Sequence, residues 1–432
     1  MQGLRQCSIE SIYYYRSPYT AKRDLLGEAR ALLVGPGCRV DAQSARPRPD
    51  IRRHPMLLRD KHNKAASALE FATRVGRMPV YPAATCYGQS GPDGLDQPNT
   101  ILLASNESPY PPTSDVGGAI MRSLGRLNRY PDPRNTGLRE RLSSLNDVPS
   151  SQIAIGNGSC DILLAAGSAL LESGKEIIYA WPSFSLYGHL SAATGAHEIR
   201  VPLDDEEKHD LDAMLDRITS ATRLLIVCNP NNPTATAVSL SSIASFLDEV
   251  PAHVCVIVDE AYCEFNRLDD PRESVELLDR HPNLVLLRTF SKVHGLCGLR
   301  VGFALCGSEE IPSALDQVRQ PFSCSAVAQA AAEEALKHED AVTDRVEKTG
   351  VERDLMDAGL RRLGLEPSDS QANFCWFHLP GKTVEYDLMS ELGRRGVIVR
   401  GGSALGHEGA LRVTYGLPEE NLRFLEVLAE VL

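Results

Sequence analysis

Several features that mark special classes of protein are missing from this sequence. No apolar run approaches the roughly 18 residues that a membrane-spanning helix needs, and the most apolar stretch, residues 162–171, is interrupted by Gly167 and Ser168. The 11 cysteines include no CxxC pair and the 11 histidines no HxxxH pair, so neither a disulfide framework nor a metal site is indicated. We therefore expect a soluble, cytoplasmic protein with reduced thiols, no metal and no membrane partner.

Charge is distributed unevenly along the 432 residues. Residues 1–77 hold 15 Lys and Arg against 7 Asp and Glu, a net charge of +8, whereas the rest of the chain carries −20. An acidic body argues against a nucleic-acid partner, because phosphate backbones are bound by basic faces. The basic segment, with Arg and Pro clustered at 46–49, is expected to be disordered or a non-native extension. It is either a transit peptide or the product of translation from an upstream start, with Met56 or Met78 as the true initiator.

At 432 residues the chain is long enough for two or three domains. From about residue 150, short runs rich in Val, Ile and Leu alternate with helical patterns, as in 152–156, 176–180, 223–228 and 254–262. Such alternation predicts an α/β domain with a mainly parallel sheet that is buried on both faces. After residue 306 the pattern changes to long charged helices within 325–364, followed by short strand candidates. This change predicts a second, smaller α+β domain.

Polar residues follow four of the predicted strands, where parallel sheets bind ligands. They are the GNGSC segment (156–160) before a helix, the NPNNPT loop (229–234), Asp259 after an apolar run, and Ser291-Lys292 with Arg300 eight residues beyond the lysine. Each has an ordinary alternative: a helix cap, a turn, a buried ion pair or a surface lysine. Together they indicate an anion cradle, an amide-rich loop, a carboxylate for a cationic nitrogen and a nucleophilic lysine.

This combination resembles the fold type I pyridoxal-phosphate aminotransferases, in the group that holds histidinol-phosphate and aromatic amino acid aminotransferases. The resemblance covers residues 78–432 and is carried by LLASNESPYPP (102–112), NRYPDP (128–133), CNPNNPT (228–234), VDEAY (258–262), RTFSKVHGLCGLR (288–300), SQANFCWF (370–377) and LRVTYG (411–416). It implies a sheet of the seven-stranded type between helices. It also implies an N-terminal arm with a small-domain segment at 78–125, a large cofactor domain at 126–322 and a small domain at 323–432.

The resemblance also implies roles for individual residues. Lys292 would form the covalent link to pyridoxal 5'-phosphate and then carry the substrate's proton, and Asp259 would keep the pyridine nitrogen protonated. Tyr262 and Asn232 would bind the ring oxygen, and Phe184 would stack on the ring. The phosphate would be held by Ser159, Cys160, Ser291 and Arg300, with Tyr130 reaching the cofactor of a neighbouring subunit in a homodimer.

Arg412 and Arg400 in the small domain would bind the anionic end of the substrate, together with Asn232, because a guanidinium suits a carboxylate or phosphate. The first expectation for the reaction is amino transfer between histidinol phosphate, in histidine biosynthesis, and 2-oxoglutarate. The alternatives are an aromatic amino acid aminotransferase, a decarboxylase of the threonine-phosphate type and a non-enzymatic relative. Two positions depart from the family pattern: Ala235 replaces a common glycine, and His294 replaces an aromatic residue or alanine.

Overall fold

The computed structural model describes residues 71–79, 100–381 and 383–432, all within one unit of the chain, Glu70–Leu432. Most of the basic extension expected at 1–77 lies outside the described residues. Its described end forms an exposed 3-10 helix, η3 (Thr73–Gly76). No helix in the described ranges combines the length and apolarity that crossing a bilayer requires.

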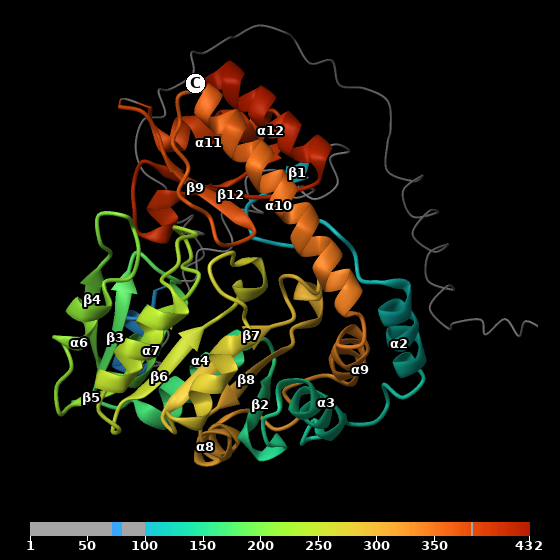
Figure 1. Ribbon diagram of the computed structural model, residues 1–432, viewed down its shortest axis with the longest axis vertical. Coiled ribbons are helices and arrows are strands. Elements are labelled where there is room, and N and C mark those ends of the chain that lie inside the picture. The colour runs from blue at the N-terminus through green and yellow to red at the C-terminus, as the bar shows by residue number, and fades with distance from the viewer. Residues whose placement is uncertain (1–70, 80–99, 382) are drawn as a thin grey trace, which may run out of the picture. The chain divides into compact units, whose positions relative to one another are not determined.

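A sheet of seven strands forms the centre of the larger domain (Figure 1). Its order is β2-β8-β7-β6-β5-β3-β4, and every neighbouring pair is parallel except the two that involve β8. The predicted α/β fold with a mainly parallel sheet of seven strands is confirmed. The strands are β2 (Ile153–Gly156), β3 (Glu176–Trp181), β4 (His197–Pro202), β5 (Thr222–Cys228), β6 (Cys255–Asp259), β7 (Leu284–Thr289) and β8 (Gly302–Cys306).

Alternate side chains of these strands enter two apolar cores, one on each face of the sheet. Ile177 and Tyr179 of β3 belong to one core, and Ile178 and Ala180 belong to the other. Successive side chains of a strand point to opposite faces, so a run that is apolar throughout requires cover on both. The first core is covered by α4 (Ser159–Leu170), α5 (Leu186–Thr194) and α8 (Glu310–Val318); the second includes residues of α2 (Ser114–Leu124), α3 (Thr136–Asn146), α6 (Leu211–Leu215), α7 (Leu240–Glu249) and α9 (Ala326–Ala335).

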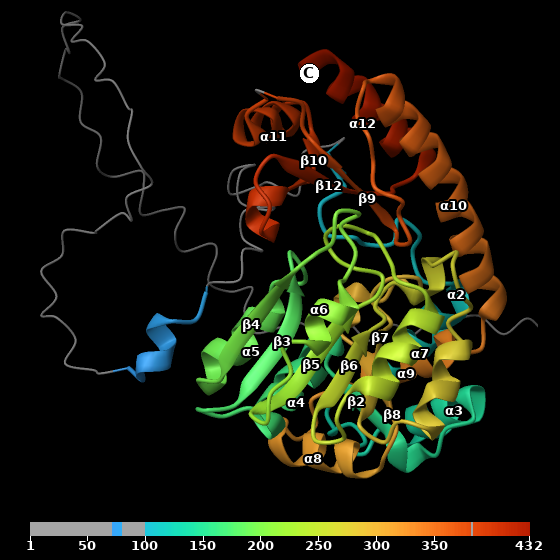
Figure 2. The ribbon, with the colours of Figure 1, turned by 60° about the vertical axis from the view of Figure 1, so that its left-hand side comes forward.

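The smaller domain packs three helices against short strands, which are grouped in Figure 2. Its antiparallel sheet has the order β11 (Arg400–Gly401), β12 (Ala410–Thr414) and β9 (Phe374–His378). The helices are α10 (Glu339–Arg362), α11 (Glu385–Arg394) and α12 (Pro418–Val431). Short 3-10 turns complete the described chain: η4 (Ser150–Gln152), η5 (Cys263–Phe265), η6 (Glu273–Asp279), η7 (Cys297–Leu299) and η8 (Gly402–Leu405).

The segment 397–400, expected to be one strand, contributes to two sheets. β10 (Val397–Ile398) pairs in parallel with β1 (Ile101–Leu102), and Arg400 begins β11, which pairs with β12. The pairing with β1 draws the segment that follows Leu102 into the smaller domain, where Leu103 packs in its core. Residues 103–107 thereby lie near the carboxyl ends of the strands of the large sheet.

The eight cysteines that the structure describes are all free thiols. Cys228, Cys306 and Cys375 occupy buried strand positions. Cys306 and Cys375 behave as small core residues, as their sequence context predicts, whereas Cys228 lies at the end of β5 beside the polar groups of a cavity.

Four turns of the large sheet meet at one edge. β5, β6 and β7 run in parallel, and β2 points the same way because both β2 and β7 are antiparallel to β8. The carboxyl ends of these strands therefore place Gly156, Cys228, Asp259 and Thr289 along the same side. Ligands of open α/β sheets bind at this edge.

Candidate active site

A cavity of about 540 Å³ lies at the carboxyl ends of the central strands. A volume of this size holds a ligand as large as a cofactor with a small substrate. Its lining includes most of the residues singled out from the sequence: Ser159, Cys160, Phe184, Asn232, Asp259, Tyr262, Ser291, Lys292, Arg300, Arg400 and Arg412.

Lys292 enters this cavity from the loop that follows β7. Its ammonium donates hydrogen bonds to the carbonyl oxygens of Asn106 at 2.9 Å and Ser105 at 3.3 Å. Burial and the nearby Arg412 guanidinium lower the pKa of Lys292 to about 8. A lysine with such a pKa is partly neutral near physiological pH, and a neutral amine is a nucleophile and a base.

Asp259 is the last residue of β6 and is 3% exposed. Its Oδ2 accepts a hydrogen bond of 2.8 Å from the hydroxyl of Tyr187, a buried residue of α5. Its Oδ1 is buried and has no hydrogen-bond partner among the described residues. Burial raises the pKa of this carboxyl to about 6, against the opposing hydrogen bond from Tyr187. A buried acceptor without a donor is costly, so the site suits a ligand with an N–H group at this point.

The turn after β2 forms an anion cradle at the start of α4. Gly158 has a φ of +79°, a conformation that favours glycine, and a Cβ there would come within 2.5 Å of Arg300 Nη2. Arg300 Nη1 also donates to Ser291 Oγ at 3.4 Å. The N–H groups of the first turn of a helix lack intrahelical partners and attract anions. A guanidinium, two hydroxyl side chains and the α4 N-terminus together fit a phosphate.

Hydrogen bonds across the cavity connect Tyr262 with two asparagines. The Tyr262 hydroxyl accepts from Asn106 Nδ2 at 3.0 Å and from Asn232 Nδ2 at 3.5 Å. Arg412 donates from Nη1 to Asn232 Oδ1 at 2.6 Å and from Nη2 to the Ala104 carbonyl at 2.6 Å. The large domain, the small domain and the segment after β1 therefore all contribute to one network.

The two predicted substrate arginines are direct partners in the small sheet. Arg400 of β11 is in register with Arg412 of β12, and each is 7% exposed. Residues that lie opposite each other on antiparallel strands have side chains on the same face. Two guanidinium groups on one face beside the cavity favour an anionic substrate group there.

Tyr130 lies apart from the cavity. It is 82% exposed and stacks on Phe322, with 4.6 Å between the ring centroids. Its expected contact is with the cofactor of a neighbouring subunit, and this role stays a prediction. Phe184 does line the cavity, edge-on to the Tyr187 ring.

Sequence reasoning missed several residues of the site. Tyr187 was given no role, and nothing in its local pattern distinguishes it from a core aromatic of a helix. Asn106 and Glu107 belong to a quoted motif, LLASNESPYPP, but were given no role. Cys297 and Leu405 also line the cavity.

Ala235, noted as a departure from the family pattern, has a structural consequence. It is buried and has a φ of +62°, a conformation that glycine adopts without the steric cost borne by a Cβ. The loop holds it there, because its N–H donates to Asn231 and its carbonyl accepts from Gln371. This chain therefore carries local backbone strain beside Asn232.

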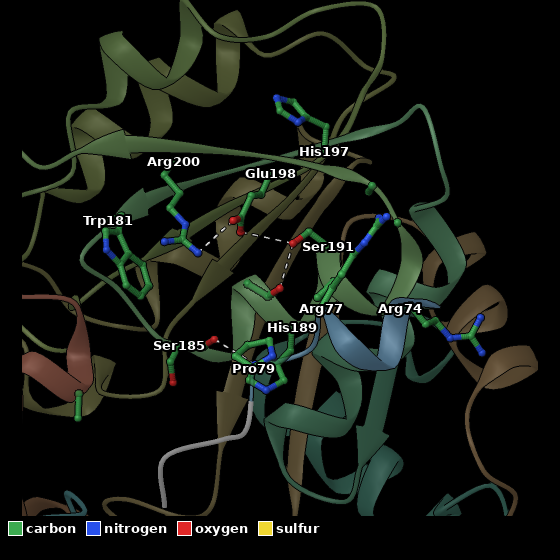
Figure 3. A pocket seen from close by; sticks show the side chains of 15 residues that line it. Arg74, Arg77, Pro79, Trp181, Ser185, His189, Ser191, His197, Glu198 and Arg200 are labelled. Carbon is green, nitrogen blue, oxygen red and sulfur yellow. Dashed lines mark hydrogen bonds and ion pairs between the residues drawn. The ribbon is translucent and has the colours of Figure 1, made fainter. Parts of the chain in front are cut away.

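A second hollow, of about 590 Å³, lies beside β3, β4 and α5 (Figure 3). Arg200 is placed over the Trp181 ring there, at 4.5 Å from the centroid, and Arg74 and Arg77 contribute from the segment with η3. None of the residues predicted to be catalytic lines it. Size alone therefore does not identify the reactive cavity in this protein.

The fold is that of solved aminotransferases. The structure of histidinol-phosphate aminotransferase from Sinorhizobium meliloti, in complex with pyridoxal-5'-phosphate, matches with a TM-score of 0.76 and 25% identity, over 85% of this chain and 99% of the other. An aspartate aminotransferase double mutant from Thermus thermophilus matches with a TM-score of 0.73 and 24% identity, over 84% of this chain and 100% of the other.

The residues of this cavity fit pyridoxal 5'-phosphate, the cofactor that the resemblance implies. The unpartnered Oδ1 of Asp259 suits the ring N–H, and the cradle of Gly158, Ser159 and Arg300 suits the phosphate. Lys292 would provide the amine for the cofactor aldehyde. The three requirements are met within one cavity.

Sequence comparisons agree with the structural ones. An aromatic amino acid aminotransferase of Streptomyces avermitilis is 42% identical over 341 residues, 79% of this chain and 93% of its own length. A histidinol-phosphate aminotransferase of Geobacillus thermodenitrificans is 40% identical over 334 residues, 77% and 90% of the two chains. The family model for aminotransferase class I and II matches residues 98–428. The chain therefore belongs to the class I and II aminotransferases, which confirms the resemblance seen in its sequence.

Proposed function

We propose that this chain transfers the amino group of an aromatic L-amino acid to 2-oxoglutarate. The observation that carries the transaminase assignment is the placement of Lys292 and the open acceptor atom of Asp259 in one cavity. The choice of donor is supported by relatives named aromatic amino acid aminotransferases, at up to 42% identity. This order differs from the expectation drawn from the sequence, which placed histidinol phosphate first.

Each residue of the cavity has a separate role in the reaction. When bound, pyridoxal 5'-phosphate accepts the electron pair left when the donor's Cα loses its proton. Asp259 holds the proton on the ring nitrogen, and its negative charge acts within a buried, low-dielectric site. Lys292 Nζ takes the proton from Cα and returns it on the cofactor side. Arg300, Ser291 and the α4 N-terminus hold the phosphate.

The pKa of Lys292 predicts how covalent loading of the cofactor-free protein depends on pH. Only the neutral amine can attack the cofactor aldehyde, and a pKa of about 8 makes half of it neutral at that pH. Loading should therefore accelerate as the pH rises towards 8 and level off above it. An exposed lysine would keep accelerating to about pH 10. Stopped-flow absorbance after mixing with pyridoxal phosphate measures this, and continued acceleration beyond pH 9 would contradict the environment described for Lys292.

Tyr187 should act as a positioning residue for Asp259. The Tyr187→Phe variant removes the hydroxyl that donates to Oδ2 and leaves the ring, so we expect kcat/KM to fall about tenfold, as for the loss of one hydrogen bond to a charged group. The pKa of Asp259 should also rise, since this donor opposes the effect of burial. The acid limb of the pH profile of kcat/KM should then move to higher pH. A fall in activity with an unmoved acid limb would assign Tyr187 a packing role only.

Histidinol phosphate is the second candidate donor. The paired Arg400 and Arg412 favour it, because a phosphate has more charge and more acceptor oxygens than a carboxylate and gains more from two guanidinium groups. The relative from Geobacillus thermodenitrificans carries that name.

The donor is identified by comparing kcat/KM for phenylalanine, tyrosine and histidinol phosphate, each with 2-oxoglutarate. The proposal expects one of the aromatic amino acids to lead. A lead for histidinol phosphate would replace it with the second candidate. Release of carbon dioxide without formation of glutamate would instead identify a decarboxylase.

Variants of the two arginines separate substrate anchoring from cofactor binding. Arg412→Ala should lower kcat/KM by roughly 30- to 900-fold, which corresponds to about 2–4 kcal/mol for truncating a buried charge pair. Arg400→Ala should harm histidinol phosphate more than phenylalanine. Neither change should remove the cofactor's absorption band. Loss of that band in either variant would place the arginine in the cofactor site instead.

A homodimer is part of the proposal. Tyr130 is suited to reach a partner's cofactor because most of its side chain is exposed at the surface. Light scattering should then give a mass of about 94 kDa, twice that of the 47.1 kDa chain.

A further inference from the structure

A carboxylate and two imidazoles meet outside the reactive cavity. Glu207, His378 and His407 each offer one ligand atom, and the three atoms lie within 4.8 Å of one another. Glu207 comes from the turn between β4 and α6, His378 is the last residue of β9, and His407 follows η8. The cluster therefore spans the large and the small domains.

The turn that carries Glu207 is held firmly. The Glu207 carbonyl accepts hydrogen bonds from the hydroxyls of Thr234 at 3.0 Å and Thr236 at 2.6 Å, in the loop that also carries Asn232. Its carboxylate Oε1 accepts from the indole N–H of Trp376 at 3.1 Å. Outer hydrogen bonds of this kind orient a carboxylate that binds a metal.

The two histidines present ring nitrogens to this carboxylate. His378 Nε2 lies 2.9 Å from Glu207 Oε1, and the rings of His378 and His407 are 4.8 Å apart between centroids. His407 Nδ1 lies 3.1 Å from the Glu408 carbonyl, which can only accept a hydrogen bond, so Nε2 is the ring nitrogen left to bind an ion. Histidines that bind metals commonly donate their other ring N–H to a backbone carbonyl.

We propose that Glu207, His378 and His407 bind one divalent transition-metal ion, with zinc as the best match, and that water completes the coordination. One carboxylate with two imidazoles is an established zinc ligand set, and bonds of 2.0–2.2 Å place tetrahedral ligand atoms roughly 3.3 Å apart. The 2.9 Å between Glu207 Oε1 and His378 Nε2 is shorter than this spacing, and the three ligand atoms lie within 4.8 Å of one another, so binding an ion requires these side chains to rotate. The His407 ring also packs edge-on against Trp376, 6.1 Å between centroids, so the same indole that donates to Glu207 lies beside the third ligand.

The cluster is open to solvent. His378 is exposed, which gives an ion access to the three side chains.

The site would connect the elements that carry the substrate residues. His378 and Arg412 lie on paired strands, β9 and β12, while the turn of Glu207 is bonded to the loop of Asn232. A bound ion would therefore restrain the small domain against the large one. Zinc at a hundredfold excess over its Kd should raise the Tm by roughly 4 °C.

The test uses the untagged holoenzyme, freed of metal with a chelator and titrated with zinc alone at pH 8. We expect the wild type to bind one more equivalent of zinc than His378→Ala or His407→Ala. Glu207→Gln preserves an acceptor for Trp376 and should bind at least about tenfold more weakly. His253→Ala is the matched control, because it removes an exposed histidine from another part of the chain. Cobalt should give the visible absorption of a tetrahedral site in the wild type and the control only.

Cysteine thiols elsewhere bind zinc equally in all these variants, so the result is the difference in zinc stoichiometry and affinity between variants. Equal stoichiometry and affinity in the wild type and in a His378→Ala/His407→Ala double variant would overturn the proposal. The variants should retain the wild-type Tm without metal and the same metal-free transamination rate. If one fails to fold, the cobalt spectrum of Glu207→Gln decides the question, and a spectrum unchanged from wild type would also overturn the proposal.

Discussion

Lys292→Ala should abolish covalent loading with pyridoxal phosphate and lower kcat by about 10⁴-fold. The variant removes both the amine that bonds to the cofactor and the base that moves the Cα proton, and a positioned base alone contributes up to about 10⁴-fold. Absorbance of the cofactor after gel filtration measures the loading. Coupled detection of glutamate measures the rate.

The same variant should fold at least as stably as the cofactor-free wild type. Because the folded-state pKa of Lys292 is lowered to about 8, the folded protein disfavours the lysine's charge at every pH below that value. Removing the charge relieves this cost, which offsets the two lost hydrogen bonds. Lys337→Ala, at an exposed lysine of the surface, is the control and should retain full activity. A Lys292→Ala protein that still transaminates at a comparable rate would refute the assignment of the lysine.

Asp259→Asn should lower kcat by about 10³-fold while leaving the fold intact. An amide of the same shape can still contact Tyr187, but it carries no charge to hold the proton on the cofactor ring. Removing one preorganised electrostatic group from a buried site costs about 10²–10³-fold, and here the group acts on a full positive charge. Single-turnover measurement of the donor half-reaction reports the chemical step directly.

The pH dependence distinguishes this electrostatic role from a structural one. Burial raises the pKa of Asp259 to about 6 in the cofactor-free protein, so its carboxyl becomes protonated as the pH falls through that value. Cofactor retention by the wild type should then weaken below about pH 6, and Asp259→Asn should lack this step. A variant that keeps the acid step would show that another group titrates there.

The sequence by itself determined the class of fold and placed four polar segments of the reactive cavity at the ends of its strands. Continuous apolar runs demand burial on both faces, and alternation with helices demands mainly parallel strands. The carboxyl ends of such strands share one edge, so the loops of Asp259 and Lys292 were expected to meet although 33 residues separate them. These inferences depend on local pattern and on a rule of topology, both of which a single sequence contains.

Only the tertiary structure decided which groups complete the site. Tyr187 reaches Asp259 across 72 residues, and Asn106 reaches Tyr262 across 156. The register of β11 against β12 set Arg400 beside Arg412, and the split of 397–400 between two sheets was not visible in its sequence pattern.

The cluster of Glu207 with two histidines shows the same limit. Its members showed no ligand spacing along the chain, and Glu207 and His378 are 171 residues apart. Hydrophobic periodicity and turn-forming residues predict only which residues are neighbours within one helix, strand or turn. Contacts between distant side chains depend instead on strand register and on how two domains pack, because these set which side chains point at the same volume.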